Sequence, residues 1–215
     1  MIITDLEIKT FVNSDFEENL YVVWLKDSKD CIAVDPGFDP REAIEFIKKE
    51  GMTPRGILVT HAHLDHVAGL AAMKKEWPAA EILIGEKERS KLGDPNGNLS
   101  AFFGCPMAAA DADRTLADGE QFEVAGIPMT ALLCPGHSSG HMVYRIDGED
   151  GFAVFVGDVV FAGSVGRTDF PGGSTEQLLA SIRKHLLTLP DPTAFYSGHG
   201  PKTTVGREKV SNLWF

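Results

Sequence analysis

The chain contains few cysteines and no long apolar run. Its 215 residues include only Cys31, Cys105 and Cys134, an odd number without CxxC spacing. Neither a disulfide framework nor a cysteine-type zinc site is therefore expected. The longest uncharged segment, 125–144, holds two prolines and three glycines, which argues against a membrane-spanning helix. The opening MIITDLEIKT has no basic region and is interrupted by Asp5, so no signal peptide is expected. Together with free thiols, this favours a cytoplasmic location.

Basic residues are also scarce. Lysine and arginine total 20 against 31 aspartates and glutamates, and the formal net charge is −11. Proteins that bind nucleic-acid backbones depend on basic side chains that meet phosphates, so nucleic acid is not an expected partner. With 43% hydrophobic residues, the chain can bury a sizeable core. We expect one domain over residues 1–215, with no linker that divides it.

Strand-like and helix-like segments alternate along the chain. NLYVVWLKD and CIAVDPG predict a hairpin over residues 19–37, and HMVYRIDGEDGFAVFVGD predicts a similar hairpin over residues 141–158. Helices are expected over residues 39–51, where Asp39 would cap the first turn, over residues 66–77, and over residues 174–190 with Ser174 or Thr175 as cap. The repetition suggests two β-plus-helix halves that pack sheet to sheet, with the helices outside.

The alternation of strand-like and helix-like segments is absent between residues 93 and 118. A long irregular loop in a compact domain usually has a function. Phe102, Phe103 and Cys105 in this loop could line a pocket. The alternative is that the two phenylalanines insert into the core.

Six of the seven histidines lie in turns that follow apolar segments. Sites in layered α/β proteins gather beyond the carboxyl ends of strands, so these side chains are candidates for one site. Imidazoles together with carboxylates suit Zn, Fe or Mn. Four strands end in this way: GILVT before His61 and His63, TALLCPG before His137, FAVFVG before Asp158, and TAFYSG before His199.

Within the first cluster, His61 and His63 are two residues apart and project from one face of an extended segment. Asp65 and His66 follow at the turn into the next helix. Taken alone, Asp65 could instead be the N-cap of that helix. His141 is expected to support the site by hydrogen bonding rather than as a ligand, and His185 to be a solvated helix residue.

Four motifs resemble the metal-binding motifs of the metallo-β-lactamase fold superfamily: THAHLDH (60–66), CPGHSSGH (134–141), GDVVF (157–161) and SGHG (197–200). GSVGRTDFPGG (163–173) is similar to the short bacterial glyoxalase II-like branch, which lacks the carboxyl-terminal helical domain. The resemblance implies a four-layer αββα sandwich with two pseudo-symmetric halves and a dinuclear site at one edge. One ion would be held by His61, His63 and His137, the other by Asp65, His66 and His199, with Asp158 between them and Asp35 in a supporting position.

The resemblance also implies a hydrolase. Two divalent ions, with zinc as first choice and iron or manganese as alternatives, would activate a water as hydroxide for attack on an acyl carbonyl. Asp158 and Asp65 would be the catalytic carboxylates. The small-molecule substrate would be a hydroxyacylglutathione-like thioester or a related ester. Without the helical domain, part of the family's glutathione site is missing. Arg167 would bind a substrate carboxylate, or alternatively pair with Asp169.

Two other functions remain open. An iron persulfide dioxygenase would use His61, His137 and Asp158 around one iron. A non-catalytic metal-binding module could share the same fold. The terminal segment 213–215 is apolar and could dock on its own domain or on a second copy in an oligomer.

Overall fold

The computed structural model describes residues 5–13, 15–148 and 151–215, which form two mixed six-stranded sheets. The first sheet has the order β1-β2-β3-β4-β5-β6 and the second β14-β13-β10-β9-β8-β7. The strands of the first sheet are β1 (Leu6–Val12), β2 (Asn19–Leu25), β3 (Asp30–Val34), β4 (Thr53–Val59), β5 (Glu81–Gly85) and β6 (Arg114–Leu116). Those of the second are β7 (Gln121–Val124), β8 (Ile127–Leu133), β9 (Met142–Gly148), β10 (Gly151–Gly157), β13 (Ala194–Ser197) and β14 (Thr203–Thr204). A small ribbon pairs β11 (Val160–Phe161) with β12 (Ser164–Val165).

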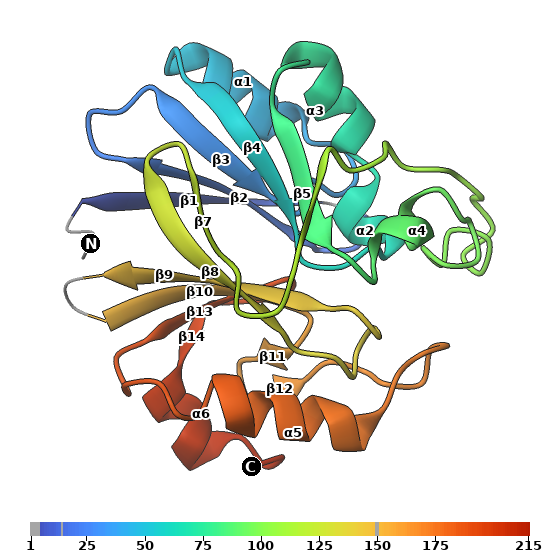
Figure 1. Ribbon diagram of the computed structural model, residues 1–215, viewed down its shortest axis with the longest axis vertical. Coiled ribbons are helices and arrows are strands. Elements are labelled where there is room, and N and C mark those ends of the chain that lie inside the picture. Colours follow the sequence, from blue (N-terminus) through green and yellow to red (C-terminus); the bar gives the residue numbers. More distant parts are fainter. Residues whose placement is uncertain (1–4, 14, 149–150) are drawn as a thin grey trace.

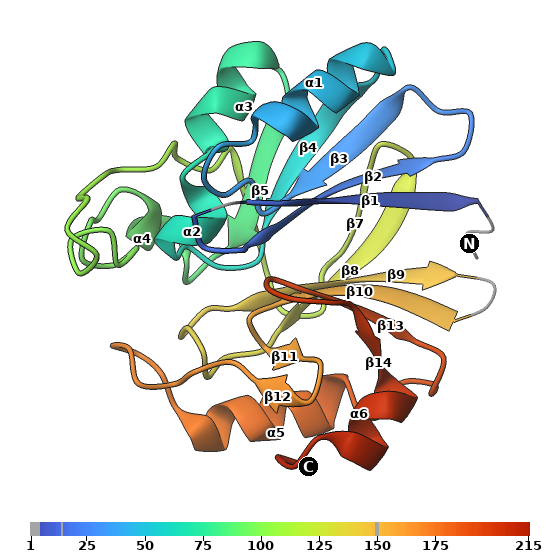
Figure 2. The same cartoon turned by 180° about the vertical axis from the view of Figure 1, so that it is seen from behind.

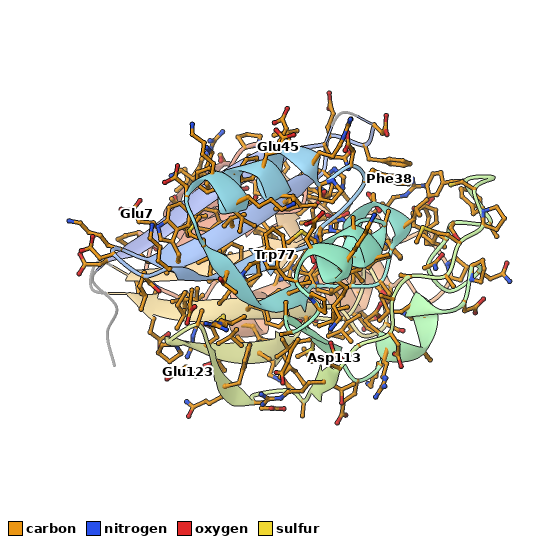
Figure 3. All side chains as sticks on the ribbon, turned by 90° about the horizontal axis from the view of Figure 1, so that it is seen from above. Glu7, Phe38, Glu45, Trp77, Asp113 and Glu123 are labelled. Atoms are coloured by element: carbon orange, nitrogen blue, oxygen red, sulfur yellow. The ribbon has the colours of Figure 1, made fainter. Side chains whose placement is uncertain are left out.

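Four of the six helices in the described ranges cover the outer faces of the two sheets, and α2 and α4 lie at one edge (Figures 1 and 2). The six helices are α1 (Arg41–Lys49), α2 (Leu64–Val67), α3 (Leu70–Glu76), α4 (Arg89–Leu92), α5 (Thr175–His185) and α6 (Val205–Ser211). α1 and α3 lie outside the first sheet, where Figure 3 shows Glu45 of α1 on the outer surface. α5 and α6 lie outside the second sheet. The expected αββα sandwich is confirmed. None of the helices in the described ranges combines the length and the apolar character needed to cross a bilayer.

Side chains on the inner strands alternate between the two faces of each sheet, and the buried ones form three apolar layers. In β2, Leu20 and Val22 face the helices outside the first sheet, whereas Tyr21 and Val23 face the second sheet. Strands buried on both faces read as continuous apolar runs, as NLYVVWL does. The third layer lies between the second sheet and α5, where Leu178 and Ile182 are fully buried. The two expected hairpins, β2–β3 and β9–β10, are both present, one in each sheet.

The helix boundaries depart from expectation at three places, one of which is the end of α5 at His185, five residues before Pro190. Asp39 does not cap α1: Pro40 takes the N-cap position, and the Asp39 carboxylate accepts hydrogen bonds from Arg41. The single helix expected over residues 66–77 is two helices, α2 and α3. Gly69 separates them because its backbone N–H donates to the carbonyl of Pro36 at 2.9 Å. Ser174 caps α5 as expected, by accepting a bond from the Gln177 N–H.

Candidate metal centre

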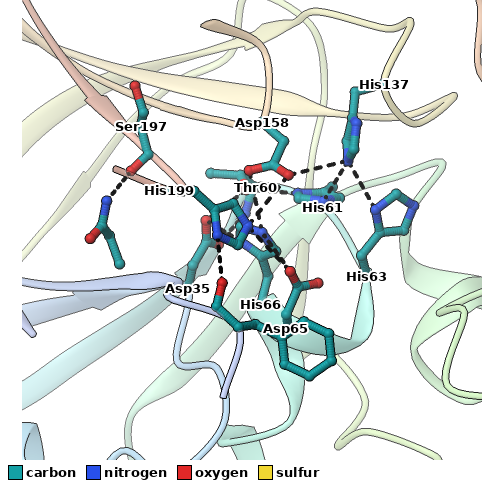
Figure 4. A network of polar contacts seen from close by, with 12 residues as sticks. Asp35, Thr60, His61, His63, Asp65, His66, His137, Asp158, Ser197 and His199 are labelled. Atoms are coloured by element: carbon teal, nitrogen blue, oxygen red, sulfur yellow. Dashed lines mark hydrogen bonds and ion pairs between the residues drawn. The ribbon is translucent and has the colours of Figure 1, made fainter. Parts of the chain in front are cut away.

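Loops from both sheets meet at one edge of the sandwich and bring seven histidines and aspartates together (Figure 4). β4 leads into the loop of His61 and His63, whereas β8, β10 and β13 lead to His137, Asp158 and His199. Among the described residues, the nitrogen and oxygen atoms form three groups of three, in each of which all the atoms lie within 4.8 Å of one another. Two of these groups share no residue and are called the donor groups here, and the third, His61, His66 and Asp158, joins them. The first donor group is His61, His63 and His137, and the second is Asp65, His66 and His199.

The first donor group directs three ring nitrogens at one point. His137 Nε2 lies 3.2 Å from His61 Nε2 and 2.9 Å from His63 Nδ1. All three rings are buried. Burial first, and the neighbouring imidazoles second, lower the pKa of His61 well below its ordinary value and that of His63 to about 3. His61 and His63 are therefore neutral at pH 7, which is the state that binds a metal ion.

The carboxylate of Asp158 lies between the two donor groups. Its Oδ2 is 3.6 Å from His137 Nε2 and 3.6 Å from His199 Nε2, and its Oδ1 is 3.4 Å from His66 Nε2. Burial alone would raise the pKa of Asp158, but the charges of these three histidines together hold it well below its usual range. Asp158 is thus an ionised carboxylate that faces both groups.

Asp65 joins the second donor group and does not cap a helix. Its Oδ2 lies 3.2 Å from His199 Nε2. α2 begins after His63, and no side chain caps it. The N-cap alternative for Asp65 is therefore wrong.

The geometry fits bound cations. Two buried atoms in this cluster, His66 Nε2 and Asp158 Oδ1, face each other at 3.4 Å but form no hydrogen bond. Leaving such an atom unsatisfied costs about 1–3 kcal/mol. A divalent ion would satisfy both, and a donor set of imidazole and carboxylate without thiolate suits zinc, iron or manganese.

Several histidines of the two donor groups are fixed through their second ring nitrogen. His66 Nδ1 lies 3.1 Å from Asp35 Oδ2, which also accepts from Thr60 Oγ1 at 2.7 Å. His137 Nδ1 lies 2.8 Å from the carbonyl of Arg167, and His199 Nδ1 lies 3.1 Å from that of Phe16. A ring whose Nδ1–H donates to an oxygen presents a bare Nε2 to a cation. Asp35 thus has the supporting position expected for it.

The two remaining histidines lie outside both donor groups. His141 Nε2 accepts from the backbone N–H of Asp158 at 3.2 Å, and its ring stacks on His61 at 4.6 Å. It therefore holds the Asp158 backbone, as expected from the sequence. His185 is half-buried at the end of α5.

Glu88 connects the two histidine loops and was not found from the sequence. It is fully buried. Its Oε2 accepts from the Ala62 N–H at 3.0 Å, and its Oε1 accepts from the Gly140 N–H at 2.8 Å, Ser138 Oγ at 2.6 Å and Lys91 Nζ at 2.6 Å. Ala62 lies between His61 and His63, and Gly140 lies in the loop of His137. In GEKERS, nothing marks which of the two glutamates is buried.

A second joint connects β2 to the end of β13. The backbone N–H of Asn19 donates to the Gly198 carbonyl at 2.7 Å, and its side-chain amide donates to the carbonyls of Ser197 at 2.9 Å and Gly200 at 2.8 Å. Tyr21 Oη donates to the Ser197 carbonyl at 2.5 Å. Because His199 lies inside this segment, the joint positions the last donor of the second group.

A cavity of about 520 Å³ opens above the donor atoms. Apolar side chains that line it include Phe16, Leu99, Phe103, Phe161 and Phe170. Phe103 is 44% exposed and Phe102 is 71% exposed, so neither inserts into the core. Phe103 lines the cavity as one alternative anticipated, whereas Phe102 and Cys105 are not among its lining residues.

Arg167 at the rim pairs with Asp169. Two hydrogen bonds of 2.7 and 2.6 Å join the guanidinium to the carboxylate, and the guanidinium carbon lies 4.0 Å from the ring centroid of Phe170. Of the two roles considered for Arg167, the structure therefore shows the pairing with Asp169.

Comparison with known proteins decides the family. A model of the Metallo-beta-lactamase superfamily matches residues 14–199. The chain belongs to the metallo-beta-lactamase superfamily. Members of this superfamily are generally hydrolytic metalloenzymes that bind metal ions through a cluster of histidines and aspartates, and this chain carries such a cluster.

Similar members of the superfamily match over most of their length. Hydroxyacylglutathione hydrolase GloC of Haemophilus influenzae is 38% identical over 200 residues, which is 92% of each chain. The crystal structure of BLEG-1 B3 metallo-beta-lactamase has a TM-score of 0.91 at 36% identity and covers 97% of this chain and 99% of that one. The crystal structure of TTHA1623 in a di-iron-bound form has a TM-score of 0.83 at 31% identity and covers 96% of this chain and 100% of that one.

Proposed function

We propose that the protein is a dinuclear metallohydrolase that cleaves thioesters or related acyl esters. The observation that carries this proposal is the convergence of seven donors from both sheets, with a carboxylate between two groups of three. The similarity to a hydroxyacylglutathione hydrolase over 92% of the chain supports the thioester class. Zinc is the first choice of metal, and the di-iron form of TTHA1623 keeps iron as an alternative.

A pair of divalent ions held by the two donor groups would lower the pKa of a bound water toward neutrality and would stabilise negative charge on an attacked carbonyl oxygen. Side chains of the protein supply the positioning of the two donor groups, a proton acceptor and the apolar surroundings. Asp158 spans the two donor groups and sets their separation. Asp65 lines the cavity, where it can orient a water and accept its proton. The apolar side chains around the cavity exclude bulk water from the reacting carbonyl.

The test combines metal content with turnover. Protein loaded with zinc, iron or manganese is expected to hold two ions per chain and to cleave S-lactoylglutathione or a simple acyl thioester, and chelation should abolish the activity. A His63→Ala variant should lose metal and activity together, whereas Glu86→Gln, which changes an exposed residue, should lose neither. A fully loaded protein that cleaves no thioester, lactone or β-lactam would contradict the proposal and favour a non-catalytic module.

The persulfide dioxygenase remains the second candidate because His61, His137 and Asp158 all lie in the cluster. A single iron on three ligands would leave Asp65, His66 and His199 without a function, so the complete second donor group favours the hydrolase. Iron-loaded protein that consumes oxygen with glutathione persulfide would reverse this preference.

We also propose a partner class, a location and an oligomer contact for this protein. The partner is a small molecule, and three free thiols agree with a reducing cytoplasm. The terminal segment contacts its own domain through Phe215, while Leu213 is 97% exposed. Leu213, together with Trp214, which is 46% exposed, is therefore what a second copy would contact in an oligomer.

A further inference from the structure

We propose that the cavity selects substrates with an aromatic acyl group on a small uncharged thiol, in preference to glutathione thioesters. This inference rests on the proposed thioester hydrolysis and concerns which thioester the site accepts. The features that carry it are an aromatic wall, made of Phe16, Phe103 and Phe170, and a rim whose one guanidinium is already paired.

The aromatic wall comes from three distant segments that meet above the donor atoms. Phe16 lies edge-on to Phe103 at 5.6 Å between ring centroids, and Phe103 lies 6.3 Å from Phe170. Phe170 lies 5.7 Å from the ring of His63 in the first donor group. Phe38 stacks on Phe16 at 5.1 Å and supports it from behind. A planar apolar group beside a carbonyl held at the donor atoms would therefore contact aromatic faces and edges.

The wall remains partly open to solvent. Phe16 and Phe170 are half-buried, and Phe103 is 44% exposed. Exposed aromatic rings grouped around a site are typical of a binding surface for an apolar ligand. An aromatic acyl group would remove this surface from water.

The charge around the cavity does not match glutathione, which carries two carboxylates. Among the described residues that line the cavity, Arg167 is the one cationic side chain apart from the imidazoles. Its guanidinium is held by Asp169 and lies over Phe170. Asp169 already occupies Nε and Nη2 of this guanidinium, so a substrate carboxylate cannot take the same paired position while Asp169 holds it. In the structure, Arg167 instead contacts a ring of the aromatic wall.

The test is a two-by-two set of thioesters assayed with the zinc-loaded full chain. The acyl group is acetyl or phenylacetyl, and the thiol is N-acetylcysteamine or glutathione. Wild-type protein is expected to show a kcat/KM about tenfold higher for phenylacetyl than for acetyl, the size of effect that an apolar pocket provides. For each acyl group, kcat/KM should be higher for the N-acetylcysteamine ester than for the glutathione ester.

Variants connect the preference to the wall. Phe103→Ala and Phe170→Ala should each reduce the phenylacetyl-to-acetyl ratio several-fold, mainly through KM for the phenylacetyl ester. Phe103→Leu, which keeps an apolar side chain, should retain part of the ratio. Trp214→Ala is the matched control, because Trp214 is 46% exposed and is not among the residues that line the cavity; its ratio should equal that of wild type. Circular dichroism verifies that each variant is folded.

The assays distinguish failure of the proposed substrate preference from failure of the proposed hydrolase activity. Equal kcat/KM values for the two acyl groups, glutathione esters cleaved as well as or better than N-acetylcysteamine esters, or an unchanged phenylacetyl-to-acetyl ratio in both alanine variants would overturn this inference while the hydrolase stands. If the metal-loaded protein cleaves none of the four thioesters, the proposed function itself fails.

Discussion

Replacing Glu88 by glutamine should separate the two loops that hold the first donor group. Both carboxylate oxygens accept from fixed backbone N–H groups, Oε2 from Ala62 and Oε1 from Gly140. Whichever way the amide is turned, its NH₂ faces one of these N–H groups. At least one buried donor therefore loses its acceptor, and Lys91 loses its negative partner.

The expected decrease in the free energy of unfolding follows from these lost contacts. Breaking a buried ion pair by removing one charge costs about 3–5 kcal/mol. The Lys91 side chain is 20% exposed, so water recovers part of its charge and a loss of about 3 kcal/mol is expected. At about 2–4 °C per kcal/mol for a chain of this size, Tm should fall by about 6–12 °C.

Thermal and urea unfolding of metal-free protein would measure this effect, because bound ions would add their own stabilisation. Glu86→Gln is the matched control: Glu86 is exposed, and its replacement should change the free energy of unfolding by less than about 0.5 kcal/mol. In a separate titration, Glu88→Gln should bind zinc about tenfold more weakly, as when a residue that supports a metal ligand is changed. A Glu88→Gln variant as stable as Glu86→Gln would refute the role assigned to Glu88.

Three further experiments, two substitutions and one thiol titration, test other parts of the structure. A Cβ on Gly198 would lie 2.2 Å from Asp158 Oδ1, so Gly198→Ala should reduce the metal content below two ions per chain in elemental analysis; full occupancy would show that the carboxylate can move without loss. Asp158→Asn removes the charge between the donor groups and should lower kcat by about a hundredfold or more at saturating zinc, and a near-normal kcat in steady-state assays would contradict its position. Burial raises the pKa of the Cys31 thiol to about 12 and that of the Cys134 thiol further still, so both stay protonated below pH 9. A thiol reagent should therefore label only the exposed Cys105 in native protein, and all three cysteines after unfolding. Rapid labelling of all three in native protein would rule out this packing.

The histidine positions were predictable because they depend on local sequence. An apolar strand followed by glycine and histidine places a side chain at a sheet edge, and His137 and His199 are both found there. The layered fold followed from the same strands, since runs such as NLYVVWL must be buried on both faces.

Features that depend on contacts between distant segments were not predictable. The division between α2 and α3 arises because Gly69 meets the carbonyl of Pro36, which no property of residues 66–77 indicates. Glu88 gains its importance from loops that approach it from both sheets. Asp39 is a local exception: its carboxylate accepts from Arg41, two residues along the chain, instead of capping α1. The choice of Asp169 as partner for Arg167 could be proposed from the sequence but not decided.

The joint between Asn19 and Ser197 gives the site an order of assembly. These residues are 178 positions apart, and contacts across such separations form late because a long stretch of chain must first be ordered. The first donor group is complete once the His137 loop docks, whereas the second must wait for β13 to reach β2. A folding chain would consequently acquire its first ion before its second, and uptake of the second would mark the moment when β13 has docked against β2.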